Sequence, residues 1–188
     1  MGIGLLALAA LALPGTASAF PIAAPGTEGL KVLVGSTSNV IATYQGNSAA
    51  FSNDLYLSTP AGFFSTSIIF NNHTSAVGST VDLGSFPIGT ELIFRLHVNN
   101  TGHDFFTGPA SRNPDLHEHA RVQEGWQPNE TLVSFEDLLN GPFDYNDLSF
   151  SFTNVQTTEP SPSVPGPATL VLLGLGLAGM RLIARGKR

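Results

Sequence analysis

Acidic and amide side chains suited to binding a hard cation gather in the second half of the chain. They are spaced by one or two residues in turns beside apolar runs, and Ca²⁺ takes about six to eight such oxygen ligands. The candidate ligands are Asp115, Glu136, Asp137, Asp144, Asn146 and Asp147. The pattern favours turn-bracing, because Asp and Asn side chains hydrogen-bond to nearby backbone. The alternative is a metal site, with calcium as the candidate ion.

Histidines near this cluster offer a second kind of metal site. His117 and His119 are two residues apart, so on a strand they would share a face. Together with His103 or Asp104, they would suit zinc or another transition metal. The alternative is that these histidines are solvated or hydrogen-bonded.

Catalytic patterns are weak in this sequence. Glu136 and Asp147 are candidates for a glycosidase carboxylate pair. However, the chain has no G-x-S-x-G nucleophile elbow, no phosphate-binding glycine loop and no cysteine nucleophile. Trp126 and Tyr145 are candidates for stacking on sugars, although a lone tryptophan is more often part of a core. We expect a protein that is not an enzyme, with a secreted hydrolase as the least favoured alternative.

Short β-strands must position these residues. The runs that are rich in β-branched and aromatic residues are 31–34, 40–44, 54–57, 67–70, 92–98, 120–122, 131–135 and 148–152. Gly, Asn, Ser and Pro separate them, and residues 92–98 alternate between apolar and mostly polar side chains. Residues 135–139 are the one candidate for a short helix. The pattern predicts a mainly β fold with a single β-sandwich or jelly-roll-like domain over residues 20–155.

The charge of this domain excludes some partners. Of the 188 residues, 12% are charged. None is cysteine, and this absence excludes disulfides and thiolate metal sites. Residues 20–163 hold 14 acidic and four basic residues, a net charge of −10. Such a surface disfavours nucleic acid and suits divalent cations or simple solubility.

The N-terminus has the pattern of a secretory signal peptide. Residues 3–13 form an uncharged apolar run that Pro14 and Gly15 interrupt. Ala17 and Ala19 then stand at the −3 and −1 positions of a cleavage site. We expect residues 1–19 to be a signal helix that the export machinery recognises and signal peptidase removes.

The C-terminus combines a linker with an apolar helix. Residues 156–167 are rich in Pro, Ser and Thr and predict an extended linker. Residues 168–188 predict a transmembrane helix, because an apolar run comes before a basic tail. The tail consists of Arg181, Arg185, Lys187 and Arg188. By the positive-inside rule, this tail stays in the cytoplasm and the β domain faces outward.

The order of these C-terminal features resembles the PEP-CTERM sorting signal of exosortase substrates. The sorting motif corresponds to Val164, Pro165, Gly166 and Pro167, with Gly166 at the place of the family's central glutamate. The resemblance implies transient anchoring in the inner membrane, cleavage by an exosortase-type enzyme, and release to the cell surface or extracellular matrix. It also implies an envelope rich in exopolysaccharide.

A second resemblance covers residues 112–152. The segments 113–119, 135–138 and 144–148 resemble a β-rich domain of unknown function that is common in such secreted proteins. Leu116 stands at the usual glycine position, and residues 140–143 replace a glycine-rich acidic turn. The resemblance implies a structural role for His119 and supplies no enzymatic activity.

The expected function is therefore that of a non-catalytic surface or matrix protein. Its role would be structural or adhesive, or would involve contact with exopolysaccharide. A calcium- or carbohydrate-binding module is the main alternative.

Overall fold

The computed structural model describes residues 19–158. This part holds eleven strands and two short 3₁₀ turns, which confirms the mainly β prediction. No helix within residues 19–158 is long and apolar enough to cross a membrane. Ala17, the sorting motif, the predicted transmembrane helix and the basic tail lie outside the described residues, and Ala19 is the first residue within them.

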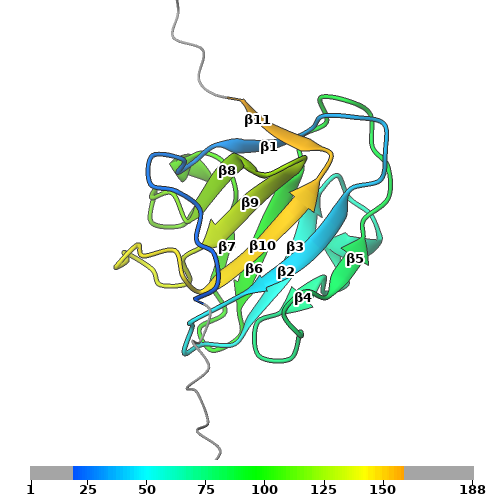
Figure 1. Cartoon of the computed structure of the whole chain (residues 1–188). Helices are drawn as coiled ribbons and strands as arrows, with labels where there is room; N and C mark the ends of the chain where they lie inside the picture. Colours follow the sequence, from blue (N-terminus) through cyan, green and yellow to red (C-terminus); the bar gives the residue numbers. More distant parts are fainter. Residues whose placement is uncertain (1–18, 159–188) are drawn as a thin grey trace, which may run out of the picture.

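Antiparallel pairing organises the strands into three sheets. The five-stranded sheet has the order β5-β2-β10-β9-β8. Its strands are β2 (Ile41–Gly46), β5 (Thr80–Asp82), β8 (Ala120–Gln127), β9 (Glu130–Phe135) and β10 (Leu148–Thr153). The four-stranded sheet has the order β4-β3-β6-β7. Its strands are β3 (Asn53–Thr59), β4 (Phe70–Asn71), β6 (Ile93–Val98) and β7 (Asp104–Phe106). The remaining strands, β1 (Lys31–Val34) and β11 (Val155–Thr158), pair with each other (Figure 1).

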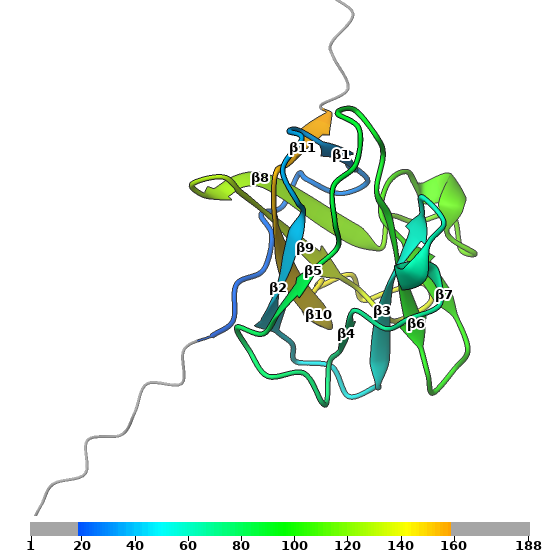
Figure 2. The ribbon, with the colours of Figure 1, turned by 90° about the vertical axis from the view of Figure 1, so that its right-hand side faces the viewer.

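The two larger sheets form two layers with the core between them (Figure 2). Phe94 of β6 stacks on Phe152 of β10 with ring centroids 4.3 Å apart, and it also contacts Phe150. These rings join one sheet to the other, and all three are fully buried. Phe94 faces the core because residues 92–98 alternate as expected from the sequence. The inward side chains are those of Leu92, Phe94, Leu96 and Val98, and all four are 0% exposed.

Several sequence predictions need correction. The strand predicted over 67–70 shrinks to Phe70–Asn71, and residues 135–139 form no helix. The strands β5 and β7 were missed because each has only three residues, too few to show a period. The predicted linker over 156–167 begins too early, because residues 156–158 complete β11 and pair with β1. These residues extend the strand because Thr has a high propensity for β-strands and because they pair with an edge of β1 that would otherwise lack a partner strand.

The connection between β9 and β10 positions the acidic cluster. Phe135 and Leu148 are partners in the antiparallel register, so residues 136–147 leave and return at one point. The amide N–H of Asp147 also donates to the carbonyl of Phe135 at 3.1 Å. Glu136 and Asp147, eleven positions apart in the sequence, are therefore held side by side.

Candidate metal centre

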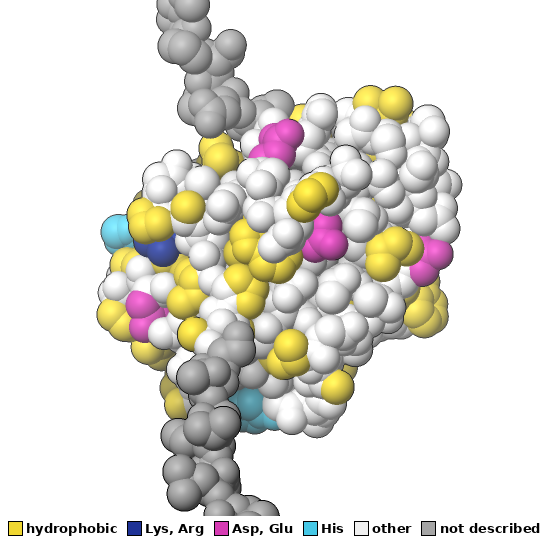
Figure 3. Space-filling view, in the orientation of Figure 1, with side chains coloured by type: hydrophobic (Ala, Val, Ile, Leu, Met, Phe, Trp, Pro, Cys, Tyr) yellow, Lys and Arg dark blue, Asp and Glu magenta, His cyan; other side chains and the backbone are white. Residues whose placement is uncertain are grey.

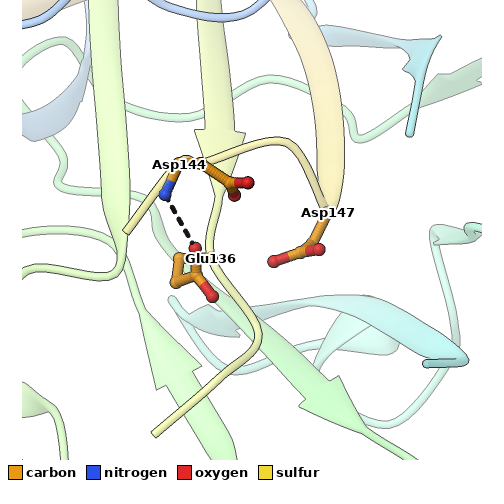
Figure 4. A group of neighbouring side chains, drawn as sticks. All are labelled: Glu136, Asp144 and Asp147. Carbon is orange, nitrogen blue, oxygen red and sulfur yellow. Dashed lines mark hydrogen bonds between the residues drawn. The ribbon is translucent and has the colours of Figure 1, made fainter. Parts of the chain in front are cut away.

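Three carboxylates of the β9–β10 loop converge on a common space. One oxygen each from Glu136, Asp144 and Asp147 lies within 4.8 Å of the other two (Figure 4). Glu136 is 1% exposed and Asp147 is 8% exposed, whereas Asp144 is exposed to solvent. We call these residues the acidic triad. An oxygen-only set with one member open to solvent is suited to a hard divalent cation.

Backbone hydrogen bonds preorganise the triad. The Oε2 atom of Glu136 accepts the N–H of Asp144 at 3.0 Å, and its Oε1 atom accepts the N–H of Leu138 at 3.1 Å. The Oδ2 atom of Asp147 accepts the N–H of Asp137 at 2.8 Å. Backbone amides thus fix both buried carboxylates, with a further bond from the N–H of Tyr145 to Glu136 at 3.5 Å, and both still have lone pairs that can bind an ion.

The loop around the triad has an unusual backbone. Asn140, Phe143 and Tyr145 all have φ near +60°, a region that bulky residues seldom adopt. Tyr145 is held there because its hydroxyl donates to the carbonyl of Glu118 at 2.9 Å and the Arg121 guanidinium lies 4.1 Å from its ring centre. Such strain persists where surrounding contacts impose it, as at ligand-binding loops.

Burial and mutual repulsion disfavour the charged form of these acids. Burial raises the pKa of Glu136 and of Asp137. For Asp147, burial and the nearby charges of Asp137, Glu136 and Asp144 raise the pKa from its ordinary 3.8 to about 8. All four Lys and Arg side chains of residues 19–158 pair with carboxylates outside the triad. Either a proton or a bound cation can relieve this repulsion.

Asn53 of β3 reaches Asp137, which adjoins the triad, from the opposite sheet. Its Nδ2 atom donates to the Oδ2 atom of Asp137 at 2.7 Å. Its Oδ1 atom is buried without a hydrogen-bond partner. An acceptor left alone in this way, next to raised-pKa acids, suits a site that takes up a proton or a cation. Sequence reasoning missed Asn53, because it lies 84 residues from Asp137 and carries no local signal.

The other predicted ligands lie around the triad. The N–H of Asp137 donates to the carboxylate of Asp147. The side-chain amide of Asn146 donates to the carboxylate of Asp144 at 2.6 Å. Asp115 is turned to a different task, because its carboxylate accepts from the N–H of Asn140 at 2.8 Å and contacts His119. The structure therefore brings together five of the six predicted residues and separates Asp115.

The predicted histidine site does not form. Residues 117–119 come before β8, so His117 and His119 do not share a strand face; His117 is exposed and His119 is 0% exposed. The Nδ1 atom of His119 faces the carbonyl of Glu136 at 3.0 Å, and its Nε2 atom faces Asp115 at 2.9 Å. Both ring nitrogens are engaged, which leaves neither free for a metal.

The structure also locates the two aromatic residues considered for stacking on sugars, and Leu116 of the second resemblance. Tyr145 is 5% exposed, too buried to stack on a sugar, whereas Trp126 of β8 is half-buried. Leu116, at the usual glycine position, has φ of 61° and is 69% exposed. The left-handed backbone explains why glycine would be favoured there.

Comparison of the chain with protein-family models, curated proteins and solved structures finds no match. The two resemblances noted in the sequence stay predictions.

Proposed function

We propose that this chain is an exported, non-catalytic protein of the cell surface or extracellular matrix, whose sandwich-like β domain binds calcium at the acidic triad. The observation that supports the proposal best is the convergence of Glu136, Asp144 and Asp147 without a paired Lys or Arg among residues 19–158. A bound ion would neutralise the repulsion and link the loop to the end of the sheet.

Calcium fits this site better than a softer metal. The ligands are carboxylate oxygens, and the described triad contains neither histidine nor sulfur. Ca²⁺ also accepts irregular geometry and backbone carbonyls, whereas Mg²⁺ requires a compact octahedron. Since the pKa of Asp147 is about 8, calcium must displace a proton near neutral pH, so affinity should rise with pH.

Hydrogen bonds favour a structural role for the candidate glycosidase pair. Glu136 and Asp147 are 1% and 8% exposed. Both carboxylates accept hydrogen bonds from the loop's own amides. Stabilising the loop accounts for these contacts.

The surface or matrix role rests on the terminal sequence patterns. Residues 1–19 and 156–188 favour export, transient anchoring in the inner membrane and exosortase-type processing. The acidic, strand-rich domain suits a structural or adhesive part of the matrix. On the face in Figure 3, acidic side chains are scattered and not gathered into a patch, so solubility accounts for them there.

A calcium titration of thermal stability tests the metal site. Calcium at 100 times its dissociation constant should stabilise purified residues 20–163 by about 2.7 kcal/mol. The melting temperature should then rise by several degrees, because about 1 kcal/mol moves a domain of this size by about 2–8 °C. EDTA should reverse the rise, and Asp144→Ala should abolish it. Asp82→Ala, which removes an exposed carboxylate on β5, is the matched control. An unchanged wild-type melting temperature would assign the triad to turn-bracing alone.

Neutralising the basic tail tests the proposed sorting route. Changing Arg181, Arg185, Lys187 and Arg188 to Gln should reduce retention in the inner membrane before processing, because these cations hold the end in the cytoplasm. Membrane fractionation of a tagged full chain measures this effect. Equal membrane retention of the wild-type and neutral chains would argue against the anchor.

A further inference from the structure

The outer face of the four-stranded sheet carries two ordered rows of side chains. Tyr56, Arg95 and Phe106 are register partners across β3, β6 and β7, so they form one row. The next row contains Asn71, Asp54, His97 and Asp104 across β4, β3, β6 and β7. Neighbouring residues on these strands point inward to the core, which leaves both rows on the outside. We call this surface the β3–β6–β7 face.

Fixed contacts hold the middle of this face. Asp104 Oδ1 lies 3.0 Å from Arg95 Nη1 and 2.8 Å from His97 Nδ1. The Arg95 guanidinium lies 4.3 Å from the centre of the Tyr56 ring and covers one of its sides. The side chains of Tyr56, Arg95, His97 and Phe106 are all half-buried, so the surface is partly open and preorganised.

Amides border the face on its polar side. The carboxylate of Asp54 accepts from Asn71 at 2.7 Å and from Asn99 at 2.9 Å. Asp54 is 7% exposed, so its charge serves mainly to orient these two amides. Amide groups fixed in this way present both donors and acceptors at known positions.

A hollow of about 240 Å³ opens at the apolar end of the face. Its lining consists of Ser58, Thr59, Ile93, Phe106 and Arg112. Arg112 is fixed by Glu91 at 2.8 Å and by the carbonyl of Thr107 at 2.9 Å. Gly108 makes room for this guanidinium, because a Cβ atom there would overlap it.

We propose that the β3–β6–β7 face binds a neutral polysaccharide chain. Tyr56 and Phe106 lie two strands apart, about 10 Å, so they can support successive units of an extended chain. Sugar rings present C–H faces to aromatic rings and hydroxyl groups at their edges. Here the rings are flanked by fixed guanidinium, carboxylate and amide groups that match such hydroxyls.

The charge and chemistry of the face favour this occupant over others. Arg95 is balanced by Asp104, and Arg112 is balanced by Glu91, so the face has no excess positive charge for an anionic chain. Among the outward residues of the two rows and the hollow, Ile93 is the one aliphatic side chain. This apolar surface is too small for an apolar contact with another protein. The inference deepens the proposed matrix role by naming a partner class, and it is independent of the acidic triad.

Affinity electrophoresis in native gels tests the proposal. Purified residues 20–163 are run in EDTA with hydroxyethylcellulose, xyloglucan, galactomannan or dextran in the gel. At least one polymer should retard the wild-type domain. The double change Tyr56→Leu and Phe106→Leu keeps apolar bulk but removes both ring faces, so apparent affinity should fall at least about tenfold. Trp126→Leu makes the same kind of change on β8, outside the face, and should leave retardation intact. Thermal melts of each variant separate a binding loss from unfolding.

Several results would overturn the inference. They are a lack of retardation with all four polymers, equal retardation of the wild type and the double variant, or a loss confined to Trp126→Leu. A wild-type dimer that becomes a monomer in the double variant would assign the face to a second copy of the chain. If the folded double variant lost retardation but kept its calcium response, the two sites would be separate. If calcium had no effect while retardation persisted, only the calcium proposal would fail.

Discussion

Changing Asp147 to Asn should stabilise the domain at pH 8 in EDTA, by an amount that grows as pH rises. The pKa of Asp147 in the folded protein is about 8, because burial and the charges of Asp137, Glu136 and Asp144 disfavour its ionisation. In the unfolded chain this pKa returns to its ordinary 3.8. Between these values the folded state holds a proton that the unfolded state has released, so stability falls as pH rises.

The size of this effect follows from the same linkage. One bound proton changes the free energy of unfolding by about 1.4 kcal/mol per pH unit. The wild-type domain should therefore keep the full contribution of protonated Asp147 below about pH 4 and lose it progressively towards pH 8. The amide that Asp147→Asn introduces cannot ionise, and it can replace the protonated carboxyl beside Asp137. The gap between variant and wild type should reach several kcal/mol at pH 8.

Urea unfolding at pH 4, 6 and 8 measures the gap. Asp82→Asn is the matched control, because the pKa of Asp82 is lowered by hydrogen bonds from Asn39 and the N–H of Gly84. That control should be no more stable than the wild type at pH 8. Calcium should narrow the gap at Asp147, since the ion binds the wild-type carboxylate more tightly than the neutral amide. A gap that is constant with pH would mean that Asp147 does not titrate as described.

The strands that pack in the core were largely predictable from the sequence. Residues 92–98 alternate so regularly that their inward face could be read directly, and β1 has the predicted bounds. The short strands β5 and β7 could not be found, because three residues carry no period and their pairing is decided by neighbours. The first residues of the predicted linker belong to β11 for the same reason, since β1 supplies their partner.

The acidic triad was only partly predictable. Composition placed Glu136, Asp144 and Asp147 among six candidates, but their convergence depends on the register of β9 with β10. Asp115 appeared equivalent in sequence and differs because His119 and Asn140 engage it. The contributions of Asn53 and of the Tyr56–Arg95–Phe106 row arise from contacts between distant strands, for which the sequence holds no local signal.

Changing Asp115 to Ala should destabilise the domain by about 1–3 kcal/mol, the usual effect of leaving a buried polar group without its hydrogen-bond partner. The Nδ1 atom of His119 faces the Glu136 carbonyl and its Nε2 atom faces the Asp115 carboxylate. Asp115 thus holds one edge of a buried ring, and loss of its carboxylate leaves that ring nitrogen without a hydrogen-bond partner. Phe105 stacks on this ring at 3.8 Å, and the side chains of His119 and Asp115 are 0% and 3% exposed.

Asp115 also joins two loops, which adds to the loss. Burial alone would raise its pKa, but hydrogen bonds from the N–H of Asn140, from His119 and from the N–H of His117 lower it from 3.8 to about 2. Its contribution is therefore present above about pH 4 and disappears as pH falls towards 2. Without the carboxylate, the Nε2 atom of the buried His119 ring loses its partner, and Asn140 loses its anchor beside the acidic triad.

A double-mutant cycle with His119→Gln, measured by urea unfolding, separates the contact with His119 from the loop anchor. If the contact with His119 dominates, Asp115→Ala should cost much less in the His119→Gln background than in the wild type. Additive losses in the cycle would instead assign the effect of Asp115 to its bonds with the backbone of Asn140 and His117.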